Sequence, residues 1–553
     1  MLVVTAAVAL GIGQPLDSVG RDPSGVEAEA KEAQARFERG RRNWLPVTGS
    51  SSGRCDERIG RFCYWYDEAD TTMPEEPAAL RRSRADLLTI LERAQALAPR
   101  SDWIIGQRVR YLTDQGMPDS AVAVTAGCTA TRWWCLALTG LGLHAAERFE
   151  LADSAFAAAI AAMPEATRCR WTDWRVLLGG DAEPTQSQTA PCSWGPRTDT
   201  LLWLAKPLLS SPGNDLRTEL LARRAMATIQ ASGMPPQLMA WGNDLEEMTL
   251  RYGWSKRWSR SSYPSSVADP PSLVGHDRPP GYWFFPFPAD STARWRWNLS
   301  ADRPRARYAP SYADRIQTTD DVAIAVFTRG DSAVVVAAVG EVRDTVFRSN
   351  VSVLSLVAET GLRARPSVVE LRGTSLSNPL VLRMRGDPRL VGVEARSADG
   401  RRHLRSRLYR PERSVGDHPI LSDPLLFQVD TELPSSLEAA ARRAIAGRRI
   451  SRREAVGVYW ELSGPRVDSV DVAVSVVPVR RGLLGRLAQG LTLVKQRVPL
   501  TLQWRAGGVT TDVEGRAIEL DLSHLELGSH LLQLVALSGS SRATTVTRFE
   551  LVP

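Results

Sequence analysis

The period of the apolar residues changes along this chain, and that change constrains the fold more than any other feature. Leu87, Leu91 and Ala94 are three and four residues apart, a spacing typical of one face of a helix. Helical spacing continues to about residue 255. After residue 320, apolar and polar residues alternate, as between Val456 and Leu462, which is the pattern of a β-strand. The sequence therefore predicts a multidomain chain, α in its first part and β in its second.

Composition and turn signals divide the chain into five expected segments. Closely spaced prolines between Pro264 and Pro288 forbid long helices there. Short strands with turns every 8–12 residues or so are typical of β-sandwiches. We expect an export segment over 1–24, a helical-repeat domain over 25–255, an aromatic- and proline-rich connector over 256–315, a β-sandwich over 316–430, and a C-terminal immunoglobulin-like β-sandwich over 431–553.

A short motif recurs within the helical part. Asp119-Ser120-Ala121 is repeated as Asp153-Ser154-Ala155, 34 residues later. Gly106 and Gly140 are separated by the same interval. Small residues are needed where paired helices approach closely, and Phe156 would fill the gap between repeats. The positions that define the repeat are Gly106, Ala121, Gly140, Ala152, Phe156, Ala159 and Pro164.

A period of 34 residues is that of the tetratricopeptide repeat, and residues 99–166 resemble two copies of it. The resemblance implies an α-solenoid of stacked hairpins, with Ala121 and Ala155 in equivalent places. It also implies a concave surface that binds a protein or peptide. A second stretch, residues 251–300, is similar to the GWxTD domain of uncharacterised exported bacterial proteins. That similarity rests mainly on Gly253-Trp254, and it implies no activity.

Six cysteines lie before residue 193, in three local pairs. Since an even number of paired cysteines suits disulfides, which persist in oxidising compartments, we expect Cys55–Cys63, Cys128–Cys135 and Cys169–Cys192. The alternative is six buried free thiols. Residues 2–12 form an apolar run that ends before Gln14-Pro15, like the core of a signal peptide. These features together predict an extracytoplasmic protein of the periplasm or cell envelope.

The sequence offers no convincing catalytic, cofactor-binding or metal-ligating set. Gly49–Gly53 formally matches G-x-S-x-G, but no strand precedes it, as a nucleophile elbow requires. Arg-Gly-Asp occurs at 329–331 and 385–387, where turn chemistry explains it. No cysteine pair has the C-x-x-C spacing of a zinc site, and the six histidines are scattered. We therefore expect no cofactor and no metal.

The net charge is +7, but 62 acidic residues are interspersed with the 69 basic ones, so we expect no nucleic-acid partner. The leading hypothesis is a non-enzymatic exported scaffold that binds a protein or peptide. One alternative is an envelope enzyme with a cleft between solenoid and connector, near His276, Asp277 and Trp283. Another is a peripheral membrane protein that uses the arginine-rich segments 442–453 and 480–497.

The C-terminal segment also carries a packing prediction. Trp460 and Trp504 lie on the apolar faces of different expected strands. We expect them to meet in one core, with partners for their indole N–H groups.

Overall fold

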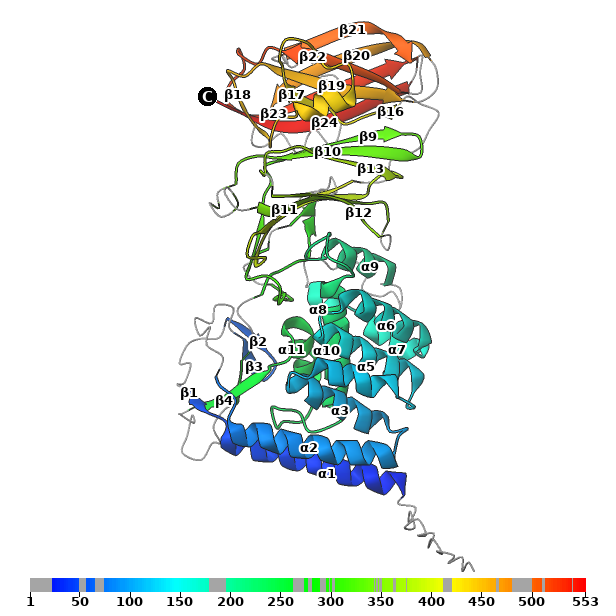
Figure 1. Cartoon of the computed structure of the whole chain (residues 1–553), viewed down its shortest axis with the longest axis vertical. Coiled ribbons are helices and arrows are strands. Elements are labelled where there is room, and N and C mark those ends of the chain that lie inside the picture. The colour runs from blue at the N-terminus through cyan, green and yellow to red at the C-terminus, as the bar shows by residue number, and fades with distance from the viewer. Residues whose placement is uncertain are drawn as a thin grey trace, which may run out of the picture. The chain divides into compact units, whose positions relative to one another are not determined.

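The computed structural model shows a chain that is helical first and rich in β-sheet afterwards (Figure 1). It describes residues 22–48, 56–64, 74–178, 195–261, 273–276, 281–288, 295–297, 299–300, 304–342, 344, 347, 351–361, 365–373, 375–410, 420–463, 467–479, 500–509, 513–539 and 541–553. The expected export segment lies almost wholly outside these residues, and so does 480–497.

The chain forms two compact units. The N-terminal unit comprises residues 1–171 and 218–278, and the C-terminal unit comprises 172–217 and 279–553. This division differs from the expected boundaries in two places. Residues 172–217 lie within the segment expected to be helical repeat, yet they belong with the β-sheets. The expected connector is divided between the units at residue 278.

Helices dominate the N-terminal unit. Asp22 caps the first of them by accepting a hydrogen bond from the Ser24 N–H, and Pro23 occupies the first turn, where no backbone donor is needed. Ser101 caps the third through the Ile104 N–H. The helices are α1 (Pro23–Arg41), α2 (Ala78–Leu97), α3 (Asp102–Asp114), α4 (Pro118–Ala126), α5 (Arg132–Ala145), α6 (Phe149–Ala162), α7 (Glu165–Trp171), α10 (Asp215–Ala231) and α11 (Asn243–Tyr252), with a 3₁₀ turn at Arg42–Trp44.

The helical hairpins α3–α4 and α5–α6 repeat at a shorter interval than the sequence motif. The first helices of the two hairpins begin at Asp102 and Arg132. The second helices begin at Pro118 and Phe149. Both intervals are shorter than the separation of the two Asp-Ser-Ala motifs, so the motif does not keep its place relative to the helix starts.

The buried alanines follow the helix starts and not the motif. Ala121 and Ala152 are each the fourth residue of their helix, and both are fully buried. Ala155 is only partly buried. The expected equivalence of Ala121 with Ala155, and of Gly106 with Gly140, is therefore wrong, because the motif is shifted within the second hairpin.

The packing of α5 against α6 depends on one glycine. Phe156 is fully buried, as predicted, and so is Ala159. A Cβ atom placed on Gly140 would lie 2.8 Å from the Phe156 ring, closer than real side chains approach. Glycine is therefore required at this point of α5, because the aromatic ring occupies the space of a side chain. Pro164 follows α6 and is exposed.

Short strands accompany these helices, and the sequence analysis did not anticipate them within the first 255 residues. A parallel pairing joins β1 to β4, and β5 continues that sheet antiparallel to β4. A separate hairpin, β2–β3, turns at Gly60, whose φ of +53° favours glycine. The strands are β1 (Val47–Thr48), β2 (Glu57–Ile59), β3 (Phe62–Tyr64), β4 (Arg257–Ser261) and β5 (Leu273–His276).

The C-terminal unit begins with two helices, α8 (Arg175–Leu178) and α9 (Gly195–Leu204), and contains one more, α13 (Leu437–Arg442). Its remaining elements are strands: β6 (Phe287–Pro288), β7 (Trp295–Arg296), β8 (Arg315–Thr318), β9 (Val322–Arg329), β10 (Ser332–Val339), β11 (Val351–Glu359), β12 (Ser367–Arg372), β13 (Leu380–Arg385), β14 (Leu390–Ser397), β15 (Arg402–Tyr409), β16 (Ile420–Leu421), β17 (Leu425–Gln428), β18 (Arg449–Ser451), β19 (Val456–Ser463), β20 (Val467–Pro478), β21 (Leu500–Val509), β22 (Val513–Leu520), β23 (Gly528–Ser538) and β24 (Ser541–Val552).

Four sheets of the C-terminal unit stack as layers (Figure 1). The first has the order β12-β11-β14-β15-β8 and the second β13-β10-β9. In the third, β19 lies between β22 and the two short strands β16 and β17. The fourth has the order β18-β24-β23-β20-β21. Separate clusters of buried apolar residues lie between the first and second layers, the second and third, and the third and fourth.

The stack explains the two kinds of strand pattern. β13 alternates buried and exposed residues, because only one of its faces is covered. β11 and β14 are buried almost continuously. One face of their sheet contacts the second layer, and the other packs on Trp203, Leu204 and Leu209 around the end of α9.

The third layer crosses the boundary that the sequence predicted at residue 431. β17 pairs antiparallel with β19, so the last sandwich takes strands from before that residue. Phe327, Phe427 and Tyr459 share one buried cluster between the second and third layers. The β-sheets are therefore one continuous stack and not two separately closed sandwiches.

Trp460 and Trp504 do meet in one core, as predicted, with ring centroids 6.1 Å apart. Trp460 is fully buried. Its indole nitrogen has no hydrogen-bond partner among the described residues. The expected partner for that N–H group is thus missing, because apolar strand residues surround the ring.

Candidate functional site

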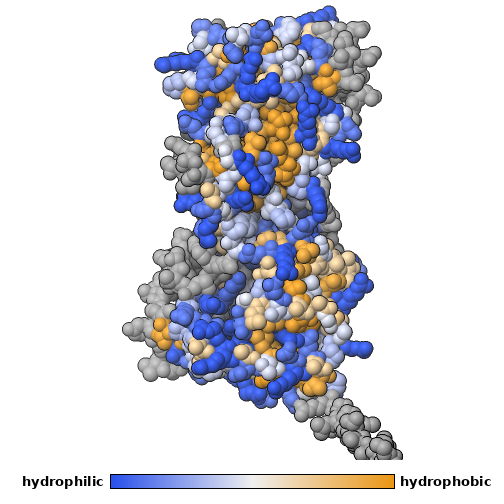
Figure 2. Space-filling model, viewed as in Figure 1, coloured by the Kyte–Doolittle hydropathy of each residue, from blue (hydrophilic) through white to orange (hydrophobic). Residues whose placement is uncertain are grey.

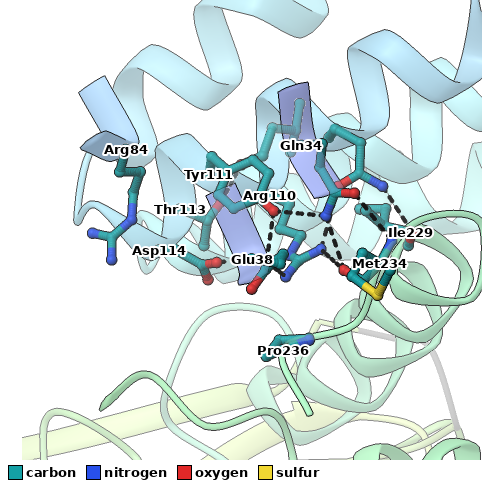
Figure 3. Close-up of polar contacts among 12 residues, drawn as sticks. Gln34, Glu38, Arg84, Arg110, Tyr111, Thr113, Asp114, Ile229, Met234 and Pro236 are labelled. Atoms are coloured by element: carbon teal, nitrogen blue, oxygen red, sulfur yellow. Dashed lines mark hydrogen bonds and ion pairs between the residues drawn. The ribbon is translucent and has the colours of Figure 1, made fainter. Parts of the chain in front are cut away.

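Charged side chains are buried where α1, α2 and α3 of the N-terminal unit come together (Figure 3). Glu38 and Arg110 are each only 1% exposed. Arg41 and Arg84 are each 6% exposed, and the Asp114 side chain 20%. We call this group, together with Glu76, the helical charge cluster. Charged groups are rarely buried unless they are paired, so the pairing decides what the cluster can do.

Glu38 is the centre of the cluster. Its Oε1 accepts hydrogen bonds from Arg110 Nη2 at 2.5 Å and from the Tyr111 hydroxyl at 2.6 Å. Its Oε2 lies 2.6 Å from Arg41 Nε. Arg110 Nε lies 3.8 Å from an Asp114 oxygen. Two arginines and a tyrosine therefore hold one carboxylate, which fixes α1 against α3.

The same helices hold the segment that follows α10. Gln34 Nε2 donates to the Met234 carbonyl at 2.8 Å, and its Oε1 accepts from the Met234 N–H at 3.0 Å. Arg41 Nη2 donates to the Pro236 carbonyl at 2.5 Å. Gln107 Nε2 donates to the Ile229 carbonyl at 3.0 Å. These bonds satisfy backbone groups at and after the end of α10, where no helical partner remains.

The charges of the cluster balance. Arg84 Nη1 donates to Glu76 Oε2 at 3.1 Å, and its Nη2 pairs with the other carboxylate oxygen. Burial raises the pKa of Asp114, and the neighbouring Arg110 guanidinium only partly opposes that rise. Burial lowers the pKa of Arg110, but Tyr111 and Glu38 outweigh it and raise that pKa overall. Three arginines thus face three carboxylates, and against the effect of burial the carboxylates raise the pKa of Arg84 and of Arg110.

One feature of the sequence indicates this cluster, although Arg84 is not among the predicted site residues. Leu80, Arg84, Leu87 and Leu91 follow one another at spacings of four and three. Arg84 therefore stands on the buried face of its helix, where a charged residue needs a partner. The helical spacing does not identify that partner, because Glu76 lies before the helix and outside its periodic pattern.

A small cavity adjoins the helical charge cluster. Its volume is about 30 Å³, room for about two water molecules. It is lined by Phe37, Glu38, Arg41, Leu45, Pro74, Glu76, Pro77, Leu80, Arg84, Arg110, Tyr111, Asp114, Gln230, Pro236, Trp254, Ser255, Lys256, Arg257 and Trp258. The cavity therefore lies where the helices meet the start of the expected connector.

A serine–histidine pair lies on the neighbouring strands β4 and β5. Ser259 Oγ is 2.7 Å from His276 Nε2. Ser259 is fully buried and His276 is 7% exposed, and neither lines the cavity. A nucleophile must be reached by its substrate, so this geometry favours a structural hydrogen bond. Asp277 lies outside the described residues, and Trp283 belongs to the other unit, so the enzymatic alternative remains a prediction.

A second buried charged group, in the C-terminal unit, holds the end of α9. Arg407 donates to the carbonyls of Leu204, at 3.0 Å, and Pro207, at 2.7 Å. Glu394 accepts from the Leu209 N–H at 2.5 Å and lies 3.7 Å from Arg407. A Cβ atom on Gly392 would lie 2.6 Å from Leu209. Strands β14 and β15 thus act as a cap for the last carbonyls of α9.

Glu359 on β11 lies within the same group. It is 2% exposed, and burial raises its pKa to about 7, with the Lys206 ammonium opposing the rise. Lys206 itself donates to the Leu209 carbonyl at 3.0 Å and the Ser211 carbonyl at 2.7 Å. Glu359 therefore titrates near neutral pH.

The outer faces of α4 and α6 carry exposed apolar residues. Leu151 is 56% exposed, and Met117, just before α4, is 41% exposed. Ala157, Ala158 and Ala161 on α6 are exposed as well. Figure 2 shows apolar colours over the region of α5, α6 and α7. We call the exposed residues of α4 and α6, with Met117, the outer helical face.

One of the expected disulfides is present. Cys128 and Cys135 are joined across the α4–α5 connection, with Cα atoms 5.8 Å apart. Cys63 and Cys169 are disulfide-bonded too, and their expected partners, Cys55 and Cys192, lie outside the described residues. A disulfide at this position is compatible with an extracytoplasmic location.

Two further sequence features have structural roles. The first Arg-Gly-Asp forms the β9–β10 turn, with Gly330 at a φ of +62°, and Arg329 Nη2 pairs with Glu461 at 2.5 Å. In the arginine-rich segment, Arg448 donates to the Val322 carbonyl and Arg443 to the Glu432 carbonyl. Arginines of the first Arg-Gly-Asp and of the arginine-rich segment therefore form contacts within the protein itself.

Among the described residues, no three or more His, Cys, Asp or Glu side chains are grouped so that they could hold a metal ion. Of the helices that the structure describes, none combines the length and apolar character needed to cross a membrane. No protein-family model and no curated protein matches this sequence.

Proposed function

We propose that this protein is a non-enzymatic, extracytoplasmic scaffold that binds a protein or peptide on the outer helical face. The observation that carries the proposal is the exposure of Leu151 and Met117 beside a row of exposed alanines on α6. Exposed apolar surface on a rigid framework is the usual chemistry of a protein interface. The same proposal includes the tetratricopeptide assignment of these hairpins, although their helix starts recur at a shorter interval than the expected 34 residues. It also includes the immunoglobulin-like assignment of the last two layers.

The charged residues of the outer helical face indicate which partner it would bind. The charged residues on α4 and α6 are Asp119, Glu150 and Asp153, all acidic. Asp119 pairs with Arg148 at 2.6 Å in an exposed position, where such a pair contributes little. An apolar segment flanked by lysine or arginine is therefore the best match to this face.

The buried charges support a structural role over catalysis. The helical charge cluster balances three arginines with three carboxylates, and its bonds hold helices and the segment after α10. An enzymatic site would instead keep a reactive group accessible to substrate. The proposal of an extracytoplasmic location is supported by the Cys128–Cys135 disulfide.

The test is affinity capture from native cell envelopes with the full chain, followed by quantitative mass spectrometry. Leu151→Arg should reduce recovery of the true partner at least tenfold, since it places a cation within the apolar face. Leu527→Arg is the matched control, because Leu527 is 50% exposed on the other unit. If every captured protein is recovered equally with both variants, the outer helical face is not the binding surface.

The membrane alternative has its own test. Arg442, Arg452 and Arg453 are exposed, and anionic vesicles would bind them more tightly at low salt. Flotation of the full chain with vesicles containing phosphatidylserine, but not with neutral vesicles, would favour that alternative over the scaffold.

A further inference from the structure

Hydrogen-bonding capacity is left unused in the wall of the cavity beside the helical charge cluster. Two acceptor atoms, Asp114 Oδ1 and Gln230 Oε1, are buried without a hydrogen-bond partner among the described residues. Two donor atoms, Trp254 Nε1 and Arg110 Nε, are also buried without a hydrogen-bond partner among the described residues. Gln230 is 3% exposed and Arg110 is 1% exposed. Buried polar atoms in native proteins are nearly always satisfied, so a polar group that enters this cavity is favoured.

The mixture of donors and acceptors selects the chemistry of that group. An ionised carboxylate has no proton to donate to Asp114 Oδ1 or Gln230 Oε1. An ammonium ion donates but cannot accept from Trp254 Nε1. A hydroxyl group does both, as does water. We propose that this cavity is a binding site for a hydroxyl-bearing, uncharged ligand, a polyol or a sugar.

The charges around the cavity also favour an uncharged ligand. Arg41, Arg84 and Arg110 stand in its wall with Glu38, Glu76 and Asp114, and each charge already has an opposite charge nearby. A charged ligand of either sign would lose its hydration beside groups of its own sign. An uncharged ligand avoids that cost. Lys256 and Arg257 also line the cavity; Lys256 is exposed and Arg257 is half-buried, so water screens both positive charges.

Size and shape set which part of the ligand enters. About 30 Å³ accepts one hydroxymethyl group or a pair of neighbouring hydroxyls, but not a whole sugar ring. The remainder of the ligand would lie outside the enclosed space, beside the other lining residues. Trp254 and Trp258 are among them, and Arg41 already stacks on Trp258 at 4.9 Å. Aromatic walls with a few placed polar groups are typical of small-molecule sites.

The experiment is a calorimetric and ligand-observed NMR titration of the full chain. The probes are glycerol, D-glucose and myo-inositol at millimolar concentration, where the general stabilising effect of polyols is small. Sodium acetate and methylammonium chloride serve as charged probes. Saturable binding of at least one polyol, and of neither charged probe, is the expected result. Stronger saturable binding of acetate would overturn the proposal, and so would no saturable binding of any polyol, which means that the cavity holds water alone.

Variants tie binding to the cavity. Trp254→Phe removes the indole N–H and keeps an aromatic ring, so the dissociation constant should rise at least tenfold. Gln230→Met removes the Oε1 acceptor, keeps a side chain of similar length, and should have a comparable effect if Trp254→Phe fails to fold. Trp44→Phe is the matched control, since Trp44 is exposed in the same unit and does not line the cavity. Equal affinities in all the folded variants would contradict this site.

Discussion

Replacing the buried carboxyl of Glu359 by an amide should stabilise the C-terminal unit at high pH and leave it unchanged at low pH. Glu359 is 2% exposed on β11, and burial raises its pKa from the ordinary 4.5 to about 7. The folded state therefore holds the proton more tightly than the unfolded state does. Glu359→Gln mimics the protonated form at every pH.

The sign and the size follow from this difference in pKa. The contribution of protonated Glu359 to stability is complete below pH 4.5 and is lost as the pH rises through 7. Each pKa unit corresponds to about 1.4 kcal/mol, so the loss above pH 8 is at most about 3.5 kcal/mol. Glu359→Gln carries no ionisable carboxyl and does not lose this stability. For a unit this large, 1 kcal/mol shifts Tm by about 2 °C, so we expect Tm to rise by up to about 7 °C at pH 8.5.

Differential scanning calorimetry of the full chain between pH 4.5 and 8.5 measures this effect. The gap between variant and wild type should be near zero at pH 4.5 and widen as the pH increases. Glu370→Gln is the control. Glu370 lies on the neighbouring strand β12, and its side chain is 41% exposed. Its carboxylate forms only a long contact, 3.8 Å, with the exposed Arg372 guanidinium. A gap that is constant with pH would refute the reasoning, since it would show that Glu359 does not titrate differently in the two states.

Further predictions concern packing, capping and the disulfide. Phe156→Ala should destabilise the N-terminal unit by about 3–5 kcal/mol in urea unfolding, because the ring is fully buried. Gly140→Ala should also destabilise it, by about 1–3 kcal/mol, although alanine favours helices; an unchanged midpoint would show that α5 and α6 can separate at no cost. Glu394→Ala should cost about 3–5 kcal/mol by leaving Arg407 without its buried carboxylate, which hydrogen exchange at the Leu209 amide would report. Cys128→Ser should lower stability by about 2 kcal/mol under oxidising conditions and have no effect in a reductant.

Local periodicity was enough to predict the coarse fold. The apolar spacing of three and four residues marked the helices, and alternation marked the strands, because both patterns record which face of an element is buried. Phe156 was correctly placed in a helical core, and Trp460 was correctly paired with Trp504. The Cys128–Cys135 disulfide also followed from short separation along the chain.

Local periodicity did not determine how the hairpin α5–α6 aligns with the hairpin α3–α4. The Asp-Ser-Ala tripeptide recurs in the sequence without occupying equivalent structural positions. The helices of the second hairpin begin fewer residues after those of the first than the spacing of the motif implies. Burial of Ala121 and Ala152 depends on where each helix begins, and that is set by contacts with neighbouring helices.

Long-range pairing decided the rest, since its partners are far apart in the sequence. Residues 172–217 join the β-sheets because Arg405, Arg407 and Glu394, much later in the chain, bind the backbone at the end of α9. Glu38 on α1 likewise meets Arg110 on α3, with the whole of α2 between them in the sequence. A single arginine or glutamate in a sequence looks like a solvated surface group, and only the tertiary structure shows that burial has forced it to find its partner.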